Sequence, residues 1–187
     1  MKITPIDNQF NLFFVEDILP LQLLDEIKKE DLWQYSWEDQ RMQSGWKRRK
    51  LLPEPGSPLS TIDNYYNNIL TNIEEIANIT FEHKHCWSSF WMDYEGFTCS
   101  IHEDGAERQY NPLMAMQIYL LDSNVDLGTV FYLDKEGKQV RYTFPYIRNT
   151  GYLMLNRPGQ WHGMTRIVPT NHVRLSSYTY FGKFNHK

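Results

Sequence analysis

The sequence predicts a mostly β protein of the α+β class, with two helices in its first half and an antiparallel jelly roll in its second half. Three observations support this fold: eight consecutive β-rich segments, turn residues between them, and two stretches of helical periodicity before them. Eight short, evenly spaced strands with no long helix between them are typical of a sandwich or barrel. The length of 187 residues suits one domain. We therefore expect a single domain over 1–187, with a helical support and loop in 1–82 and a jelly-roll core in 86–182.

The first half begins with a strand expected over 10–15 and a helix from about 20 to 32. Pro20 suits the first turn of that helix, because its fixed φ is helical and its missing N–H is not needed there. Residues 37–58 are rich in Arg, Lys, Pro and Gly, which predicts a loop. Its basic run, 46–50, is expected to be a solvated loop, with a lid over an anionic substrate as the alternative.

A second helix is expected over 59–77. Apolar residues recur there at helical spacing, and Ser60 and Asp63 suit an N-terminal cap. The two helices have one apolar face each, so we expect them to pack on one sheet of the jelly roll.

The second half contains the segments expected to be strands. They are rich in β-branched and aromatic residues, and Gly, Pro, Asn, Asp or Lys clusters separate them. The eight segments are 86–94, 97–104, 113–121, 128–133, 140–147, 151–157, 161–168 and 173–181.

Charge and cysteine content exclude several classes of protein. The formal net charge is −4, which gives no electrostatic reason to expect binding to nucleic acid or to an anionic membrane. Cys86 and Cys99 cannot form a disulfide framework, and we expect two reduced thiols. No signal peptide and no apolar run of membrane-spanning length is present. These features predict a soluble, cytoplasmic protein, and they do not indicate its oligomeric state.

Three residues form a candidate metal site. His102 and Asp104 are two apart near the end of an expected strand, so their side chains share a face. His162 lies near the start of the seventh expected strand, which can neighbour the second strand in a jelly roll. Two imidazoles and one carboxylate leave about three coordination positions open, which suits iron(II). A structural zinc site would use four ligands with more sulfur.

The other histidines are weaker candidates. His83 and His85 have strand spacing, but they precede the strand run and have no carboxylate in register. We interpret them as surface or loop residues, and His172 and His186 as exposed.

At these positions the sequence resembles the 2-oxoglutarate/iron(II) oxygenase superfamily, closest to its prolyl-hydroxylase-like branch. The similarity extends from about Trp87 to Phe181, and the signature is His102-Glu103-Asp104 followed by His162 and a basic residue. The resemblance implies a double-stranded β-helix, which is a distorted, cupin-like jelly roll. It also implies an Fe(II) site at His102, Asp104 and His162 that uses 2-oxoglutarate and O2.

The resemblance further implies a carboxylate-binding site for 2-oxoglutarate. Arg174 takes the place of the family's basic residue and would form a bidentate pair, with Ser176 on the same strand face. Arg166 is the competing candidate. Tyr119 and Thr129 resemble family positions that contact the cosubstrate, although the glycines around Thr129 depart from the family pattern.

The implied activity is hydroxylation of a C–H bond, with release of succinate and CO2. The substrate would be an amino-acid side chain, such as proline in a protein or peptide, or a small molecule. Asn156 could line the pocket or hydrogen-bond the turn that precedes His162. The other candidate pocket residues are aromatic or sulfur-containing, and each has core or sheet-face packing as its alternative role: Trp87, Trp91, Tyr94, Met154, Trp161 and Met164.

Two other functions fit the same residues. A cupin-type metalloenzyme would use the ligands without 2-oxoglutarate, but cupins usually carry a His-x-His pair and a later Glu. A non-catalytic jelly-roll module of the lectin type would need no metal at these positions. Succinate release that depends on iron and 2-oxoglutarate separates the oxygenase from both.

Overall fold

The computed structural model describes residues 1–7, 12–38, 47–82, 85–104, 113–155 and 158–186, and these form strands and helices in two layers of sheet. One-turn 3-10 helices lie at Leu32–Gln34, Leu59–Thr61 and Val125–Leu127. The main elements are β1 (Lys2–Asp7), β2 (Leu12–Glu16), α1 (Leu21–Lys29), β3 (Ser36–Glu38), β4 (Arg48–Leu52), α2 (Ile62–Ala77), β5 (Ile79–Phe81), β6 (Trp87–Tyr94), β7 (Leu113–Tyr119), β8 (Thr129–Tyr132), β9 (Val140–Phe144), β10 (Thr150–Leu155), β11 (Trp161–Gly163) and β12 (Val173–His186).

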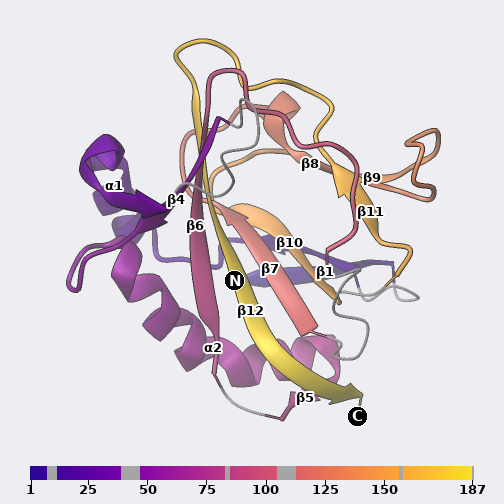
Figure 1. The fold of residues 1–187 in the computed structure, drawn as a ribbon. Helices are drawn as coiled ribbons and strands as arrows, with labels where there is room; N and C mark the ends of the chain where they lie inside the picture. Colours follow the sequence, from indigo (N-terminus) through magenta and orange to yellow (C-terminus); the bar gives the residue numbers. More distant parts are fainter. Residues whose placement is uncertain (8–11, 39–46, 83–84, 105–112, 156–157, 187) are drawn as a thin grey trace.

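The strands form a large and a small antiparallel sheet, as a jelly roll requires. The large sheet has the order β1-β2-β10-β7-β12-β6-β4-β3, and β5 pairs with the end of β12. The small sheet has the order β11-β8-β9. Figure 1 shows the small sheet on one side of the large sheet and the helices on the other. The predicted fold class, a jelly roll with helices packed on one sheet, is confirmed.

Strand β12 shows how the large sheet divides its side chains between its two faces. Leu175 and Phe181 join the buried cluster that includes the apolar face of α2. The hydroxyl of Ser177 lies 3.1 Å from that of Tyr66 on α2. Because strand side chains alternate, Arg174, Ser176, Tyr178 and Tyr180 face the small sheet. The site described below occupies this second face.

The helices are fixed to the sheet by burial of their apolar stripes. Leu24 and Ile27 of α1, and Tyr66, Leu70 and Ile73 of α2, are all 2% exposed or less. Burying one aliphatic side chain of this size stabilises the fold by about 1.5–3 kcal/mol. The helices therefore anchor the sheet that carries the site.

Seven of the eight segments predicted in the second half are strands, and the exception is 97–104. That segment runs antiparallel to 162–168, with backbone hydrogen bonds at Cys99, His102 and Phe97, but the ladder is interrupted. Gly163 lies against it so closely that an added Cβ would be 2.9 Å from the carbonyl oxygen of Cys99. Segments 97–104 and 161–168 therefore lie side by side as expected, although 97–104 is not a regular strand.

The first half differs more from expectation. Residues 1–82 contribute β1 to β5 to the large sheet, so this region is not only a helical support. Within the expected loop 37–58, β3 and β4 pair with each other, and β4 also pairs with β6. Residues 39–46 lie outside the described part.

The predicted cap of the second helix is wrong. Thr61 is the N-cap residue of α2 and makes no side-chain cap hydrogen bond. The Ser60 hydroxyl instead donates to the carbonyl oxygen of Ser57 in the preceding turn and accepts from the backbone N–H of Gly56. The prediction failed because the chain enters the helix through a 3-10 turn, which uses Ser60 itself.

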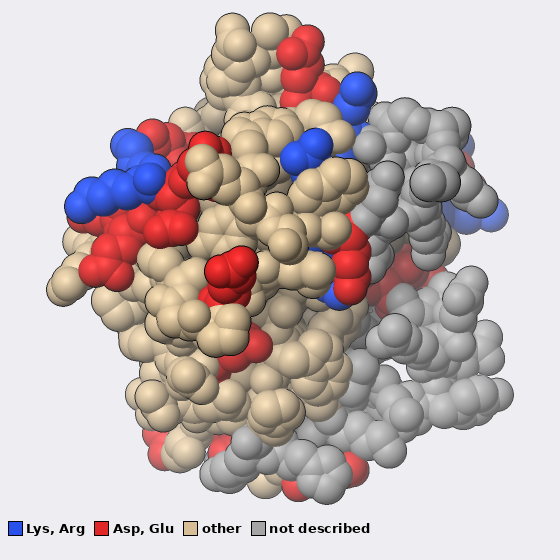
Figure 2. All heavy atoms as spheres, turned by 60° about the vertical axis from the view of Figure 1, so that its left-hand side comes forward, with Lys and Arg blue, Asp and Glu red and all other residues tan. Residues whose placement is uncertain are grey.

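The described surface has mixed charge on the face that Figure 2 draws. Lys and Arg side chains occur there in small groups beside Asp and Glu side chains. Among the described residues, no helix has the length and apolar character to cross a membrane.

Candidate metal centre

Two histidines face each other where the segment after β6 passes beside β11. His102 and His162 form an antiparallel bridge, in which each backbone N–H donates to the other's carbonyl oxygen at 2.9 Å. The centroids of their rings are 4.4 Å apart. His162 is buried and stacks on Phe131 of β8 at 5.1 Å, whereas His102 is partly exposed. The backbone pairing therefore fixes the separation of the two imidazoles.

Both imidazoles are oriented by backbone carbonyl groups. Nδ1 of His102 lies 2.9 Å from the carbonyl oxygen of Ser100, and Nδ1 of His162 lies 3.0 Å from that of Gln160. A carbonyl oxygen only accepts, so each Nδ1 carries a proton and donates it. Nε2 is then the nitrogen available to a metal ion, as is usual for metal-binding histidines held in this way.

Asp104 completes a group of three ligands. Its Oδ1 lies 3.3 Å from Nε2 of His102, and its Oδ2 lies 3.5 Å from Nε2 of His162. One ligand atom of each residue lies within 4.8 Å of the other two. These distances allow one ion to contact all three residues and to keep further coordination positions open.

The charges at this group favour a cation. Burial raises the pKa of Asp104, but His162, His102 and Tyr178 outweigh burial and hold that pKa well below its usual range. Burial lowers the pKa of His102, whereas Asp104 and the Cys99 thiol raise it, with a net rise to about 11. Asp104 is therefore an ionised carboxylate that stabilises positive charge beside it.

The donor set fits iron(II) better than structural zinc. Among the described residues, the candidate ligand group consists of His102, Asp104 and His162. Cys99 contacts Nδ1 of His102 at 3.6 Å, on the ring edge away from Asp104, so its sulfur is not directed at the ligand atoms. Two imidazoles and one carboxylate with open positions are typical of non-haem iron enzymes, whereas structural zinc takes four closed ligands.

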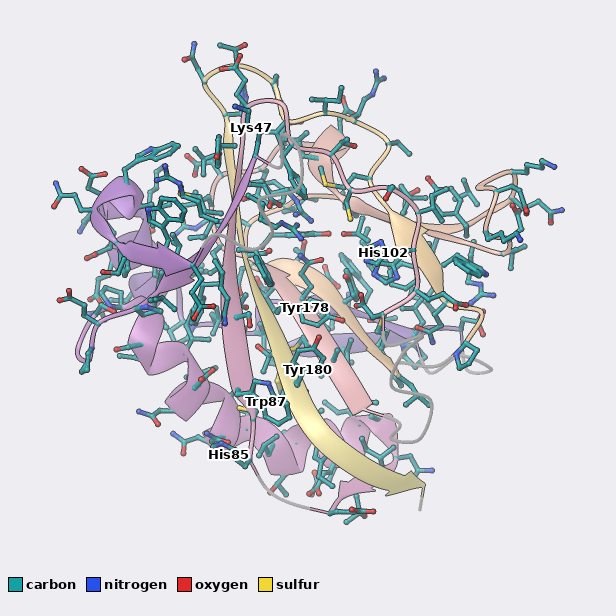
Figure 3. The ribbon with its side chains drawn as sticks, in the orientation of Figure 1. Lys47, His85, Trp87, His102, Tyr178 and Tyr180 are labelled. Carbon is teal, nitrogen blue, oxygen red and sulfur yellow. The ribbon has the colours of Figure 1, made fainter. Side chains whose placement is uncertain are left out.

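Tyr178 of β12 holds the carboxylate of Asp104 in place. Its hydroxyl donates a hydrogen bond to Oδ2 of Asp104. Burial and the nearby Asp104 raise the pKa of Tyr178 well above its usual value, so the hydroxyl keeps its proton. Figure 3 shows Tyr178 in front of β12, with Tyr180 and Trp87 following it along β12 and β6. The sequence prediction did not include Tyr178.

The metal-binding group opens into a cavity of about 160 Å³ between the two sheets. His102, Asp104 and His162 line it, and so do Arg48 and Arg174. Trp91, Tyr152, Tyr178 and Tyr180 add aromatic walls. The cavity therefore combines a cation-binding group with two guanidinium groups.

Arg174 lies in this cavity, as expected for a ligand-binding residue, but it already has partners within the protein. It is 2% exposed, and its Nη1 lies 2.6 Å from Oδ2 of Asp93, which is wholly buried on β6. Its Nε donates to the carbonyl oxygen of Leu127 at 2.9 Å. Arg166, the competing candidate, is exposed and does not line the cavity.

The other predicted cosubstrate residues form a buried polar network beside Arg174. The hydroxyl of Tyr119 donates to Oγ1 of Thr129 at 2.9 Å, and Thr129 donates to Oε1 of Gln117 at 3.3 Å. Gln117 in turn donates to the hydroxyl of Ser176 at 2.9 Å. Thr129 and Gln117 line the cavity, whereas Tyr119 and Ser176 lie behind them. Gln117 was not predicted, and its strand context gives no motif that would identify it.

The predicted pocket residues divide into two groups. Trp91 and Met164 line the cavity. Asn156 lies outside the described residues. The remaining described candidates do not line the cavity: Trp87, Tyr94, Met154 and Trp161.

His85, the described member of the rival histidine pair, lies away from the metal-binding group. His83 lies outside the described residues, and Figure 3 places His85 beside the lower end of β6, away from His102. His172 is exposed, as predicted.

Comparison with known proteins supports the fold through structure alone. No family model matches the sequence, and no curated protein matches it. A prolyl-4-hydroxylase from Pseudomonas putida is 13% identical, with 93% of each chain covered and a TM-score of 0.62. The protein has the fold of 2-oxoglutarate-dependent oxygenases.

Two further structures with this oxygenase fold carry ligands. A prolyl hydroxylase from Trichoplax adhaerens, in complex with a peptide of hypoxia inducible factor, is 12% identical; 94% of this chain and 85% of that one are covered, with a TM-score of 0.64. HygX from Streptomyces hygroscopicus, with nickel and 2-oxoglutarate bound, is 8% identical; 92% and 83% of the chains are covered, with a TM-score of 0.64. The resemblance noted in the sequence is thus confirmed at the level of the fold.

Proposed function

We propose that the protein is a 2-oxoglutarate-dependent dioxygenase that holds iron(II) with His102, Asp104 and His162. The observation that carries this proposal is the presence of a three-ligand group and of Arg174 in one cavity between the two sheets. Bound iron(II) would supply the activation of O2, coupled to decarboxylation of 2-oxoglutarate to succinate and CO2. The fold of ligand-bound relatives and the donor set support the assignment.

The protein's own residues have three tasks in this proposal. The carbonyl groups of Ser100 and Gln160 keep both imidazoles in the metal-binding orientation. Tyr178 orients Asp104, and burial of His162 and Arg174 keeps bulk water from two sides of the site. Arg174 binds the far carboxylate of 2-oxoglutarate. Its Nε donates to the carbonyl oxygen of Leu127 and its Nη1 donates to Asp93, so the pairing would depend mainly on Nη2, which lies 3.4 Å from Oγ1 of Thr129.

The substrate is an amino-acid side chain, such as proline in a protein or peptide, or a small molecule that reaches the cavity along the face of β12 that carries Tyr178 and Tyr180. A row of aromatic rings leads there from the surface. Trp87 is 42% exposed and stacks on Tyr180 at 5.5 Å, and Tyr180 lies 5.1 Å from Tyr178, the partner of Asp104. Such rings offer rigid contact area to a flat or apolar group. The cavity is smaller than the roughly 300–1,000 Å³ of sites that enclose drug-sized ligands. A substrate that inserts only one group is therefore favoured.

Turnover of 2-oxoglutarate tests the proposal. We expect succinate release by the purified protein to require both iron(II) and 2-oxoglutarate. Arg174→Gln should raise the 2-oxoglutarate concentration needed for half-maximal release on the order of tenfold or more, since a charged hydrogen-bond partner is lost. Arg166→Gln, at an exposed site, should leave it unchanged. Succinate release that does not depend on iron, or equal effects of both variants, would contradict the proposal. A protein that binds metal without consuming 2-oxoglutarate would instead be a cupin-type enzyme, and one that binds no metal would be a non-catalytic binding module.

A further inference from the structure

A buried carboxylate lies between two guanidinium groups that line the cavity. Asp93 is wholly buried, and it accepts from Nε of Arg48 at 2.5 Å and from Nη2 of Arg48 at 3.1 Å. The Asp93 oxygen that accepts from Nη2 also accepts from Nη1 of Arg174 at 2.6 Å. The two guanidinium groups therefore lie side by side, one from β4 and one from β12, and both line the cavity.

Positive charges outnumber negative charges in this cluster. Two guanidinium cations and one carboxylate give a formal charge of +1 in a place that water reaches poorly. Arg174 with Asp93 alone would be neutral, and an incoming anion would meet the negative charge of Asp93. Arg48 thus gives this cluster the net positive charge that attracts a carboxylate of the ligand. Charges that are buried from water are weakly screened, so the attraction is strong.

Arg48 is also held in position rather than left in solvent. Its guanidinium lies 4.2 Å from the centroid of the Phe97 ring and 5.1 Å from that of Trp91. Two of its nitrogens are fixed on Asp93, and Nη1 has no hydrogen-bond partner among the described residues. An arginine held between rings in this way keeps its remaining donors pre-organised for a ligand.

We propose that Arg48 and Arg174 together bind one carboxylate of the ligand, with Asp93 as the fixed counter-ion that holds both guanidinium groups. This inference rests on the proposed function, in which that carboxylate is the one of 2-oxoglutarate distant from the metal. Arg48 belongs to the basic run that the sequence predicted as a solvated loop or a lid. As part of β4, it is instead a wall of the anion site.

The decisive comparison uses two oxoacids and the manganese(II)-loaded protein. 2-Oxoglutarate and 2-oxopentanoate share the metal-binding end and the chain length, but 2-oxopentanoate has a methyl group in place of the far carboxylate. Calorimetry gives both dissociation constants, and the constant for 2-oxopentanoate divided by that for 2-oxoglutarate measures what the far carboxylate contributes to binding. In Arg48→Gln we expect this ratio to fall on the order of tenfold or more, because 2-oxoglutarate binds more weakly while 2-oxopentanoate binding is unchanged.

Two variants separate a charge effect from damage to the fold. Arg49→Gln is the control, because Arg49 lies on the same strand with its guanidinium over Trp33 and Trp37, and it does not line the cavity. The double variant Arg48→Gln with Asp93→Asn restores the formal charge of +1. It should recover a large part of the preference for 2-oxoglutarate, which a merely structural role of Arg48 does not predict.

Each outcome has one meaning. If 2-oxoglutarate binds the loaded wild-type protein and Arg48→Gln keeps the same ratio as Arg49→Gln, the role of Arg48 is refuted while the proposed function stands. If the ratio falls but the double variant recovers nothing, the formal charge alone does not account for the preference, and the direct contact of a positioned Arg48 with the carboxylate carries it. If the wild-type protein binds neither oxoacid, the proposed function fails, and the inference fails with it.

Discussion

At the scale of single residues, Tyr178 sets the position of one oxygen of Asp104. Its hydroxyl is a donor with a raised pKa, and it has no role in holding the sheets together that a phenylalanine ring could not fill. We expect Tyr178→Phe to weaken manganese(II) binding about tenfold, as loss of an outer hydrogen bond to a metal ligand typically does. Tyr180→Phe, two residues along the same strand face, is the control. Equal affinities of the two variants in a calorimetric titration would refute this role.

The charge state of His102 predicts a pH dependence of metal binding. The pKa of His102 is raised to about 11, so at neutral pH it carries a proton that the metal must displace. Asp104 has a lowered pKa and stays ionised, so it releases no proton. Metal affinity should therefore rise about tenfold per pH unit between about pH 6 and pH 8, corresponding to one proton released per ion. Titration in buffers with different heats of ionisation counts that proton. Affinity that is constant over this range would contradict the assignment.

The residues found from sequence and those missed differ in a physical way. His102, Asp104 and His162 could be predicted because their types, spacing and order are restricted by metal coordination. Asp93 and Tyr178 could not, since an aspartate or tyrosine in a strand has many ordinary roles, and only the pairing of β6 and β12 with their neighbours gives these residues their partners.

At the scale of elements, Asn149 joins the N-terminal segment to the start of β10. Its side chain accepts from the backbone N–H of Leu19 at 3.0 Å and donates to the carbonyl oxygen of Leu19 at 2.9 Å, so it imitates a backbone partner. Its φ is +63°, a left-handed conformation that asparagine tolerates better than most residues.

Substitutions of Asn149 separate the contribution of its hydrogen bonds from that of its left-handed backbone conformation. Asn149→Ala should destabilise the protein by about 2–4 kcal/mol, because it removes two buried hydrogen bonds and places alanine in the left-handed region. Asn149→Gly loses only the hydrogen bonds, so it should be roughly 1 kcal/mol more stable than the alanine variant. Urea unfolding gives both values. Equal stability of the two variants would show that the backbone conformation contributes nothing.

Strand β4 shows why elements of the first half were harder to predict. The sequence Arg48-Arg49-Lys50 reads as a solvated loop, because strands usually alternate polar and apolar residues. Here both faces of the strand hold charges that have partners: Arg48 pairs with Asp93, and Arg49 lies over Trp33 and Trp37. The strands of the second half are short runs rich in apolar, β-branched and aromatic residues, several of them wholly buried, and most of them were predicted.

At the scale of the whole molecule, the candidate site is built across the gap between the two sheets. His162 comes from the small sheet, whereas Arg174 and Tyr178 come from the large sheet. His102 and Asp104 lie on the segment that pairs with β11. The spacing between the three candidate metal ligands and Arg174 is therefore set by how the sheets pack, which the helices on the outer face stabilise.

The central claim is that one metal ion at His102, Asp104 and His162 binds 2-oxoglutarate through its oxoacid end. A 2-oxoacid chelated to iron(II) gives a visible charge-transfer absorption band. We predict that adding 2-oxoglutarate to the iron(II)-loaded protein without oxygen produces this band at one equivalent per chain. His162→Ala should abolish the band, and His172→Ala, at an exposed histidine, should keep it. No band in the wild-type protein, or an undiminished band in His162→Ala, would contradict the account.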